Sequence, residues 1–143
     1  MLRVGALLVS LLAVGAPTPA AIAQDAGSIV VKEILRTSKN DIGQIIRLSR
    51  KPIELVVSEY SIAAGARLPD HKHPFQRYAF VAQGELRVQQ VGGSSKVYKA
   101  GDFVAESVAR WHFGEAIGQS PVKLIVIDQI PRGAKSTIQR PAH

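Results

Sequence analysis

Short runs of apolar and β-branched residues, separated by turns rich in Gly, Pro and Ser, recur along most of the chain. Alternate residues of such a run lie on opposite faces of an extended strand, as the pattern in residues 52–62 illustrates. We expect strands at residues 29–35, 43–48, 52–62, 77–82, 85–91, 96–99, 103–105, 111–116 and 122–130. No run indicates a helix of ten or more residues, so the pattern predicts an all-β protein.

The number and spacing of these strands predict one barrel or sandwich. The chain has 143 residues, which suffices for one domain with one core. Gln83-Gly84 between two strands indicates a hairpin. We place the domain at residues 24–143 and its barrel core at about 52–130. Regular structure is expected to end at residues 131–133, and the polar tail beyond them is expected to be loose.

The first 23 residues have the pattern of a secretory signal peptide. Arg3 precedes an apolar run at residues 4–14, prolines follow, and Ala21-Ile22-Ala23 has the small-x-small form of a cleavage site. The alternative is a membrane anchor, but the run is short for a bilayer. We therefore expect export, into a periplasm, and no membrane attachment after cleavage.

Composition excludes several chemistries. The chain has no cysteine, so disulfides, thiolate metal ligands and a cysteine nucleophile are excluded. Its net charge is +7, and the basic residues are scattered without a dense run or interleaved aromatics. This distribution favours solubility and attraction of small anions and does not indicate nucleic-acid binding.

Three of the four histidines lie in two strand-like blocks bounded by glycines. His71 and His73 are two residues apart, and His112 lies in a later block. On a strand, the first two would share one face, about 7 Å apart along the backbone, so that both imidazoles can reach one ion. The third would have to come from another strand facing the same cavity. The alternative is a set of pocket histidines without a metal.

The first block reads GARLPDHKHPFQRYAFVAQG and resembles the first motif of the cupin superfamily. That motif is a glycine, five residues, His-x-His, three or four residues, a glutamate, six residues and a glycine. Gly65, His71, His73 and Gly84 occupy the matching positions. The glutamate position falls on Arg77, because counting four residues to Tyr78 would misplace the closing glycine.

The second block reads GDFVAESVARWHFGEA and resembles the second cupin motif in part. Gly101 and His112 match, whereas Ser107, Ala109 and Ala116 stand where proline, glycine and asparagine are usual. The chain is thus identified as similar to small single-domain cupins over about residues 52–130. The resemblance implies a double-stranded β-helix, or jelly-roll, barrel.

The resemblance also implies one divalent metal ion (Fe, Zn, Mn, Cu or Ni) at His71, His73 and His112. Without the usual glutamate, the ion would keep its full charge and leave positions open for an anionic or oxygen-chelating ligand. The chemistry could be that of three-histidine dioxygenases or of a metal-dependent lyase or isomerase.

Side chains beside these histidines are candidates for ligand or substrate contact. Arg77 either points inward and clamps a substrate carboxylate, or points outward as a solvated charge. Tyr78, on the opposite face of the strand, either packs or donates to a ligand, and Gln76 is a weak substitute metal ligand. Glu106 and Glu115, around the second motif, are either solvated or able to supply an acid or contact a metal-binding histidine.

Two functions of different classes remain open from the sequence. The first is an exported metal-binding cupin that binds or converts a small anionic or oxygen-chelating molecule. The second is a non-catalytic barrel that captures a ligand or a partner. In either case we expect a homodimer, paired through the strand predicted at residues 29–35.

Overall fold

The structure, a computed structural model, describes residues 30–141. The predicted signal peptide at residues 1–23 and the last histidine, His143, lie outside the described residues. Between residues 30 and 141 regular structure consists of strands, and no helix there is long and apolar enough to span a membrane.

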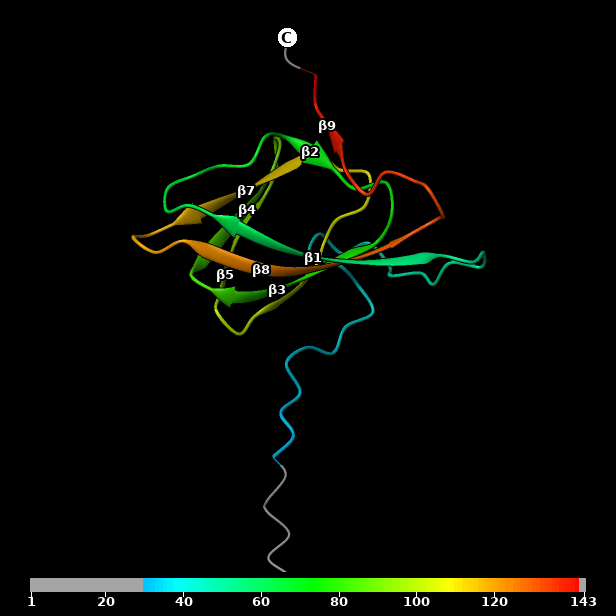
Figure 1. The fold of residues 1–143 in the computed structure, drawn as a ribbon, viewed down its shortest axis with the longest axis horizontal. Helices are drawn as coiled ribbons and strands as arrows, with labels where there is room; N and C mark the ends of the chain where they lie inside the picture. The colour runs from blue at the N-terminus through cyan, green and yellow to red at the C-terminus, as the bar shows by residue number, and fades with distance from the viewer. Residues whose placement is uncertain (1–29, 142–143) are drawn as a thin grey trace, which may run out of the picture. The chain divides into compact units, whose positions relative to one another are not determined.

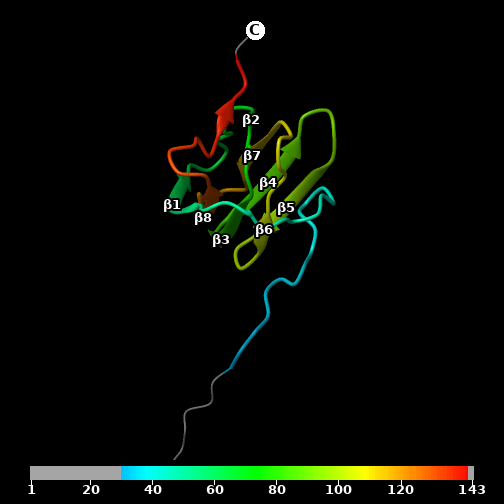
Figure 2. The same cartoon turned by 90° about the vertical axis from the view of Figure 1, so that its right-hand side faces the viewer.

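In this described part of the chain, nine strands form two antiparallel sheets that face each other as the walls of a barrel (Figures 1 and 2). The strands are β1 (Glu54–Ile62), β2 (His71–Lys72), β3 (Arg77–Gln83), β4 (Glu85–Gln90), β5 (Ser95–Lys99), β6 (Phe103–Ala105), β7 (His112–Ile117), β8 (Val122–Ile130) and β9 (Ile138–Gln139). The first sheet has the order β1-β8-β3-β6, and the second has the order β5-β4-β7-β2-β9. The predicted all-β barrel is confirmed.

The two expected strands nearest the N-terminus are wrong. Residues 30–35 contain no strand, and Ile34 and Leu35 are exposed. Residues 43–48 make only an isolated bridge, between Lys39 and Ile45. β-Branched composition shows that a segment can be extended, but a strand also needs a partner to take its backbone hydrogen bonds.

The C-terminal tail is ordered up to residue 141, where the described residues end, contrary to the expectation from sequence. β9 pairs with β2, placing Ile138 opposite Lys72. The backbone N–H of Arg140 also donates to the carbonyl of Asp70 at 2.8 Å. The tail is polar and has no alternating pattern, so its sequence does not indicate a strand. Its pairing depends instead on the backbone hydrogen bonds that the edge of β2 offers.

The interior is apolar at one end and polar at the other. Inward-facing side chains alternate with outward-facing ones along β3, β4, β7 and β8. At one end they form a cluster of buried apolar residues: Ile62, Ala79, Val81, Leu86, Val88, Tyr98, Val104, Ala116, Val122, Leu124 and Val126. Towards the other end the same faces carry buried Arg77, Gln90, His112 and Asp128. Because polar groups are costly to bury unless paired or bound, this end is the candidate site.

Two motif positions show how the backbone constrains the turns. Gly84 has φ +79°, and a Cβ there would lie 2.5 Å from the carbonyl oxygen of Pro121, so only glycine fits. Ala109, which stands where the motif that the second block resembles usually has glycine, is the one non-glycine residue with positive φ (58°) in the described part of the chain. Its N–H donates to the His73 carbonyl at 2.8 Å, which ties this strained turn to the histidine segment.

We expect Ala109→Gly to stabilise the fold by about 0.5–1 kcal/mol. Relief of the left-handed alanine, worth about 1–2 kcal/mol, exceeds the extra backbone entropy of glycine in the unfolded chain. Thermal unfolding should show a Tm higher by a few degrees. The control Ala82→Gly, at an exposed position of β3 without positive φ, should lower Tm. A fall in Tm for both variants would contradict this account.

Candidate functional site

Strand pairing brings the three histidines together at the polar end of the barrel. His71, the first residue of β2, is directly opposite His112, the first residue of β7. His73 follows two residues later and bridges to Val108. The imidazole centroids are 4.9 Å apart for His71 and His73, 4.5 Å for His71 and His112, and 5.0 Å for His73 and His112. All three side chains are buried.

Each imidazole is oriented by a backbone carbonyl at its Nδ1 atom. The acceptors are Pro69 O for His71 at 2.8 Å, Ser136 O for His73 at 3.1 Å and Arg110 O for His112 at 3.0 Å. A carbonyl can only accept, so Nδ1 carries the proton in all three rings. In a neutral ring this leaves the Nε2 lone pair free, as in metal-binding histidines oriented by an outer hydrogen bond.

The free nitrogens suit a metal ion. The three histidines each offer a ligand atom, and these atoms lie within 4.8 Å of one another. Nε2 of His73 and Nε2 of His112 are buried without a hydrogen-bond partner. Burial also lowers the pKa of His71 to about 4, so this ring is neutral at physiological pH. Converging, unpartnered lone pairs are costly unless a cation binds them, so the residues fit a divalent ion.

Glu106 reaches the same centre from the segment that follows β6. Its Oε2 atom lies 3.1 Å from His73 Nε2 and 3.3 Å from His112 Nε2. Burial would raise the pKa of Glu106, but the imidazoles of His112 and His73 and the charge of Arg77 hold that pKa well below its usual range. Burial likewise opposes the charged form of His112, but the Glu106 carboxylate outweighs it and raises the His112 pKa. The carboxylate is therefore ionised beside the histidines.

Arg77 points inward and is paired with an acid that the sequence did not suggest. Its Nε donates to Asp128 Oδ1 at 2.7 Å and its Nη2 to Asp128 Oδ2 at 2.8 Å. Nη2 also reaches the hydroxyls of Ser136 and Thr137, at 3.2 and 3.0 Å. Arg77 and Asp128 are 4% and 3% exposed, so removing either would leave the other uncompensated, at a cost of about 3–5 kcal/mol.

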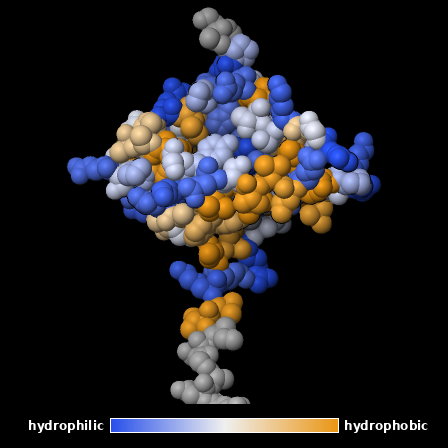
Figure 3. Space-filling view, in the orientation of Figure 1, coloured by the Kyte–Doolittle hydropathy of each residue, from blue (hydrophilic) through white to orange (hydrophobic). Residues whose placement is uncertain are grey.

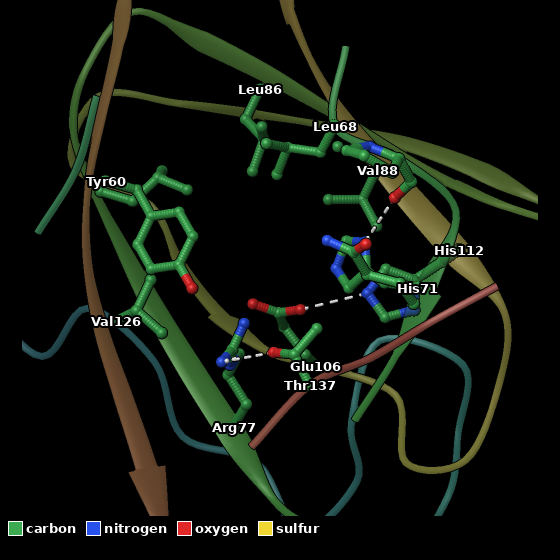
Figure 4. A pocket seen from close by; sticks show the side chains of 14 residues that line it. Tyr60, Leu68, His71, Arg77, Leu86, Val88, Glu106, His112, Val126 and Thr137 are labelled. Carbon is green, nitrogen blue, oxygen red and sulfur yellow. Dashed lines mark hydrogen bonds and ion pairs between the residues drawn. The ribbon is translucent and has the colours of Figure 1, made fainter. Parts of the chain in front are cut away.

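A cavity of about 260 Å³ opens beside these groups (Figure 4). Its polar side is formed by His71, His112, Glu106, Arg77 and Thr137. The other side is largely apolar: Tyr60, Leu68, Leu86, Val88, Leu124 and Val126. The arrangement suits a small ligand with a polar, oxygen-bearing end directed at the histidines and a less polar remainder.

The structure does not bring the other two candidates to the cavity. Tyr78 lies on the opposite face of β3 from Arg77, and the centroid of its ring is 6.1 Å from the ring centroid of Phe103. The side-chain amide of Gln76 donates to the backbone carbonyls of Arg77 and Glu106, at 2.9 and 3.2 Å. Gln76 thus supports the segment that carries Glu106.

Sequence reasoning missed Asp128 and Thr137 and underrated Glu106. Asp128 interrupts the apolar inward positions of β8, and that interruption is a usable signal for a buried partner. Glu106 stands directly before the proline position of the second motif, within its frame, but nothing in the sequence showed which way it points. Thr137 belongs to the tail that carried no pattern.

The cupin domain family matches residues 58–128. A search among curated proteins finds no match. Among solved structures, a cupin-like protein from Thermotoga maritima matches with TM-score 0.55 and 22% identity over 62% of this chain and 65% of its own.

Two enzymes share the fold to a similar extent. The DMSP lyase DddQ from Ruegeria pomeroyi matches with TM-score 0.51 and 20% identity, over 59% of this chain and 42% of the lyase. An oxalate oxidase in complex with glycolate matches with TM-score 0.51 and 22% identity, over 59% of this chain and 45% of the oxidase. This chain thus spans less than half the length of either enzyme, and at such identity the likeness concerns the fold. The family match over residues 58–128, the barrel and the paired histidine motifs agree with one another: this part of the chain is similar to the cupin domain family, and its fold is a cupin-type β-barrel.

Proposed function

We propose that this cupin is an exported protein that holds one divalent metal ion at His71, His73 and His112. There it would bind or convert a small anionic or oxygen-chelating molecule. The observation that supports this most directly is the common orientation of the three imidazoles, each with Nδ1 on a carbonyl. Such an arrangement leaves the Nε2 lone pairs for a shared cation.

The residues around the ion would divide the work. A divalent ion with open coordination positions supplies Lewis-acid polarisation of a ligand oxygen or, for a redox metal, oxygen chemistry. The apolar wall excludes water and accommodates the less polar part of the ligand. Because Asp128 neutralises Arg77, this guanidinium serves the cavity mainly as a rigid wall and only weakly as an anion clamp.

The fold neighbours favour small carboxylates as the first ligands to test. One oxalate oxidase was solved with glycolate, and an oxalate decarboxylase from Lactobacillus farciminis with formate. Molecules of this size fit a cavity of about 260 Å³ with room for a larger substituent. A cupin barrel supports many reactions, so the likeness ranks ligands without identifying the reaction.

A non-catalytic binding barrel is the second candidate. The sequence departs from the second motif at Ser107, Ala109 and Ala116, yet Ala109 has a positive φ of 58°, a backbone conformation that glycine adopts readily. The three histidines still converge in spite of these departures, which is compatible with ligand capture as well as with turnover.

A homodimer stays a prediction, and we now expect the two copies to pair through β1. β1 is an edge strand of the first sheet, and its Leu55 and Val57 are 62% and 60% exposed. Figure 3 shows an apolar band along this part of the molecule. An edge strand with exposed apolar side chains favours pairing with a second copy more than residues 30–35, which form no strand.

Metal content is the first test. Full-length protein produced with its own export signal should contain about one divalent ion per chain by elemental analysis. His71→Ala combined with His73→Ala should remove it, because two of three imidazole ligands are lost. His143→Ala, which changes the one histidine that is not a proposed ligand, should keep the ion. Folded wild-type protein without metal, even after incubation with each candidate ion, would contradict the proposal.

Ligand binding and turnover separate the two candidate functions. We expect hydroxy acids such as glycolate, or diketones, thiols or uronates, to raise the Tm of the metal-loaded protein but not of the His71→Ala/His73→Ala variant. Ligand at 100 times Kd should stabilise by about 2.7 kcal/mol. Product formation or oxygen uptake with the same compounds indicates an enzyme, and stabilisation without turnover indicates a binder.

Export is tested by the N-terminus of the processed protein. Cleavage after Ala23 should leave Gln24 as the first residue of protein recovered outside the cytoplasm. Mass spectrometry of the intact chain measures this directly. A chain that retains residues 1–23 in its cellular location would contradict the export proposal and leave the metal site unaffected.

A further inference from the structure

We propose that Glu106 is the fourth ligand of the metal ion and supplies, from the segment that follows β6, the carboxylate that the first motif lacks at position 77. The inference rests on the proposed metal site and adds to it the residue that completes its coordination and sets its charge. It is carried by three observations: the position of Glu106 in the sheet, the distances of its oxygen, and the way its backbone is held.

Glu106 lies across the β3–β6 pair from position 77, where the first motif usually has its glutamate. β3 and β6 are antiparallel with Tyr78 opposite Ala105, so Arg77 and Glu106 are the next neighbours across the pair. The N–H of Glu106 donates to the carbonyl of Arg77 at 2.9 Å, which continues this register. A side chain at 106 therefore enters the cavity at the same level as one at 77. Figure 4 shows the Glu106 carboxylate between Arg77 and the imidazoles.

The distances match atoms that share one ion. Two donor atoms, each about 2.1 Å from an ion and at right angles, lie about 3.0 Å apart. Glu106 Oε2 lies 3.1 Å from His73 Nε2 and 3.3 Å from His112 Nε2. Both nitrogens lack a hydrogen-bond partner. With Nδ1 carrying the proton, a neutral ring sets its Nε2 lone pair against the carboxylate, which is unfavourable unless a second proton or a metal ion lies between them. A metal ion bound by Glu106 and the histidines would occupy the position of that proton.

The backbone that carries Glu106 is held from two sides. Its carbonyl accepts from the side-chain amides of Asn40 and Gln76, at 3.3 and 3.2 Å. The Gln44 amide donates to Val108 O at 3.0 Å and accepts from Val108 N at 2.8 Å. These contacts give a loop residue the fixed position that a metal ligand needs.

The residue at position 77 is compatible with a carboxylate ligand that comes from position 106. Arg77 is bound by Asp128, so the pair adds no net charge to the cavity. A divalent ion with three neutral imidazoles and one carboxylate carries a net charge of +1, against +2 for three histidines alone. The site then favours a singly charged ligand, such as a monocarboxylate, over binding of several anions.

The test compares Co²⁺ binding by full-length wild-type protein, Glu106→Gln and Glu115→Gln. Glu115 lies on the same strand as His112, and its carboxylate pairs with Arg87 away from the histidines. Calorimetry should show at least about tenfold weaker Co²⁺ binding for Glu106→Gln and unchanged binding for Glu115→Gln. The visible spectrum of bound Co²⁺ should also change for Glu106→Gln, because its band positions and intensities depend on the ligand set.

Glu106→Asp separates ligation from a general charge effect and serves if Glu106→Gln fails to fold. It keeps the negative charge but withdraws it by one methylene, so a ligand role predicts weaker binding and an altered spectrum, whereas a charge effect predicts neither. Wild-type affinity and spectrum in both variants, with binding lost in His112→Ala, would overturn the role of Glu106 and leave the histidine site intact. No Co²⁺ binding by folded wild-type protein would overturn both proposals.

Discussion

The hydrogen bonds from three imidazole Nδ1 atoms to backbone carbonyls are the contacts on which the site depends. Each fixes the tautomer and the ring plane of a histidine, and together they direct three Nε2 atoms to one point. The carbonyls belong to the chain before β2, the turn before β7 and the segment before β9. Sheet pairing therefore determines the chemistry, because it sets where these carbonyls lie relative to the rings.

Charge at this end of the barrel is arranged in two separate units. One is the buried pair of Arg77 and Asp128, which is closed on itself by two short hydrogen bonds. The other is the group of three histidines with the ionised Glu106, whose Oε2 atom lies beside two imidazole nitrogens. A protein interior tolerates the first as a neutral wall. The second needs a proton or a metal ion between the carboxylate and the Nε2 atoms, and it is this unit that could hold a metal ion.

The sequence predicted the barrel and the meeting of the three histidines because both depend on period and spacing. Between residues 54 and 130 alternation located every strand closely except the two-residue β2, and the His-x-His spacing put two rings on one face. Alternation failed where a strand depends on a pairing partner elsewhere in the chain. Residues 30–35 have no partner strand and form no strand, whereas β9 pairs with β2. The direction of Arg77 was open for the same reason, because it depends on Asp128, 51 positions later. Glu106 could not be ranked without knowing that its backbone extends β6 beside β3.

The segment around Ser136 makes the geometry of the histidines depend on the docking of the chain that precedes β9. The carbonyl of Ser136 orients His73, and the hydroxyls of Ser136 and Thr137 hold Arg77. Ser136 lies 63 positions after His73, so the orientation of this imidazole depends on a segment far from both histidine motifs. Before that segment docks, His71 and His112 would have their backbone acceptors and His73 would be free to turn. The three rings can therefore converge only once β9 and the residues before it have joined the barrel.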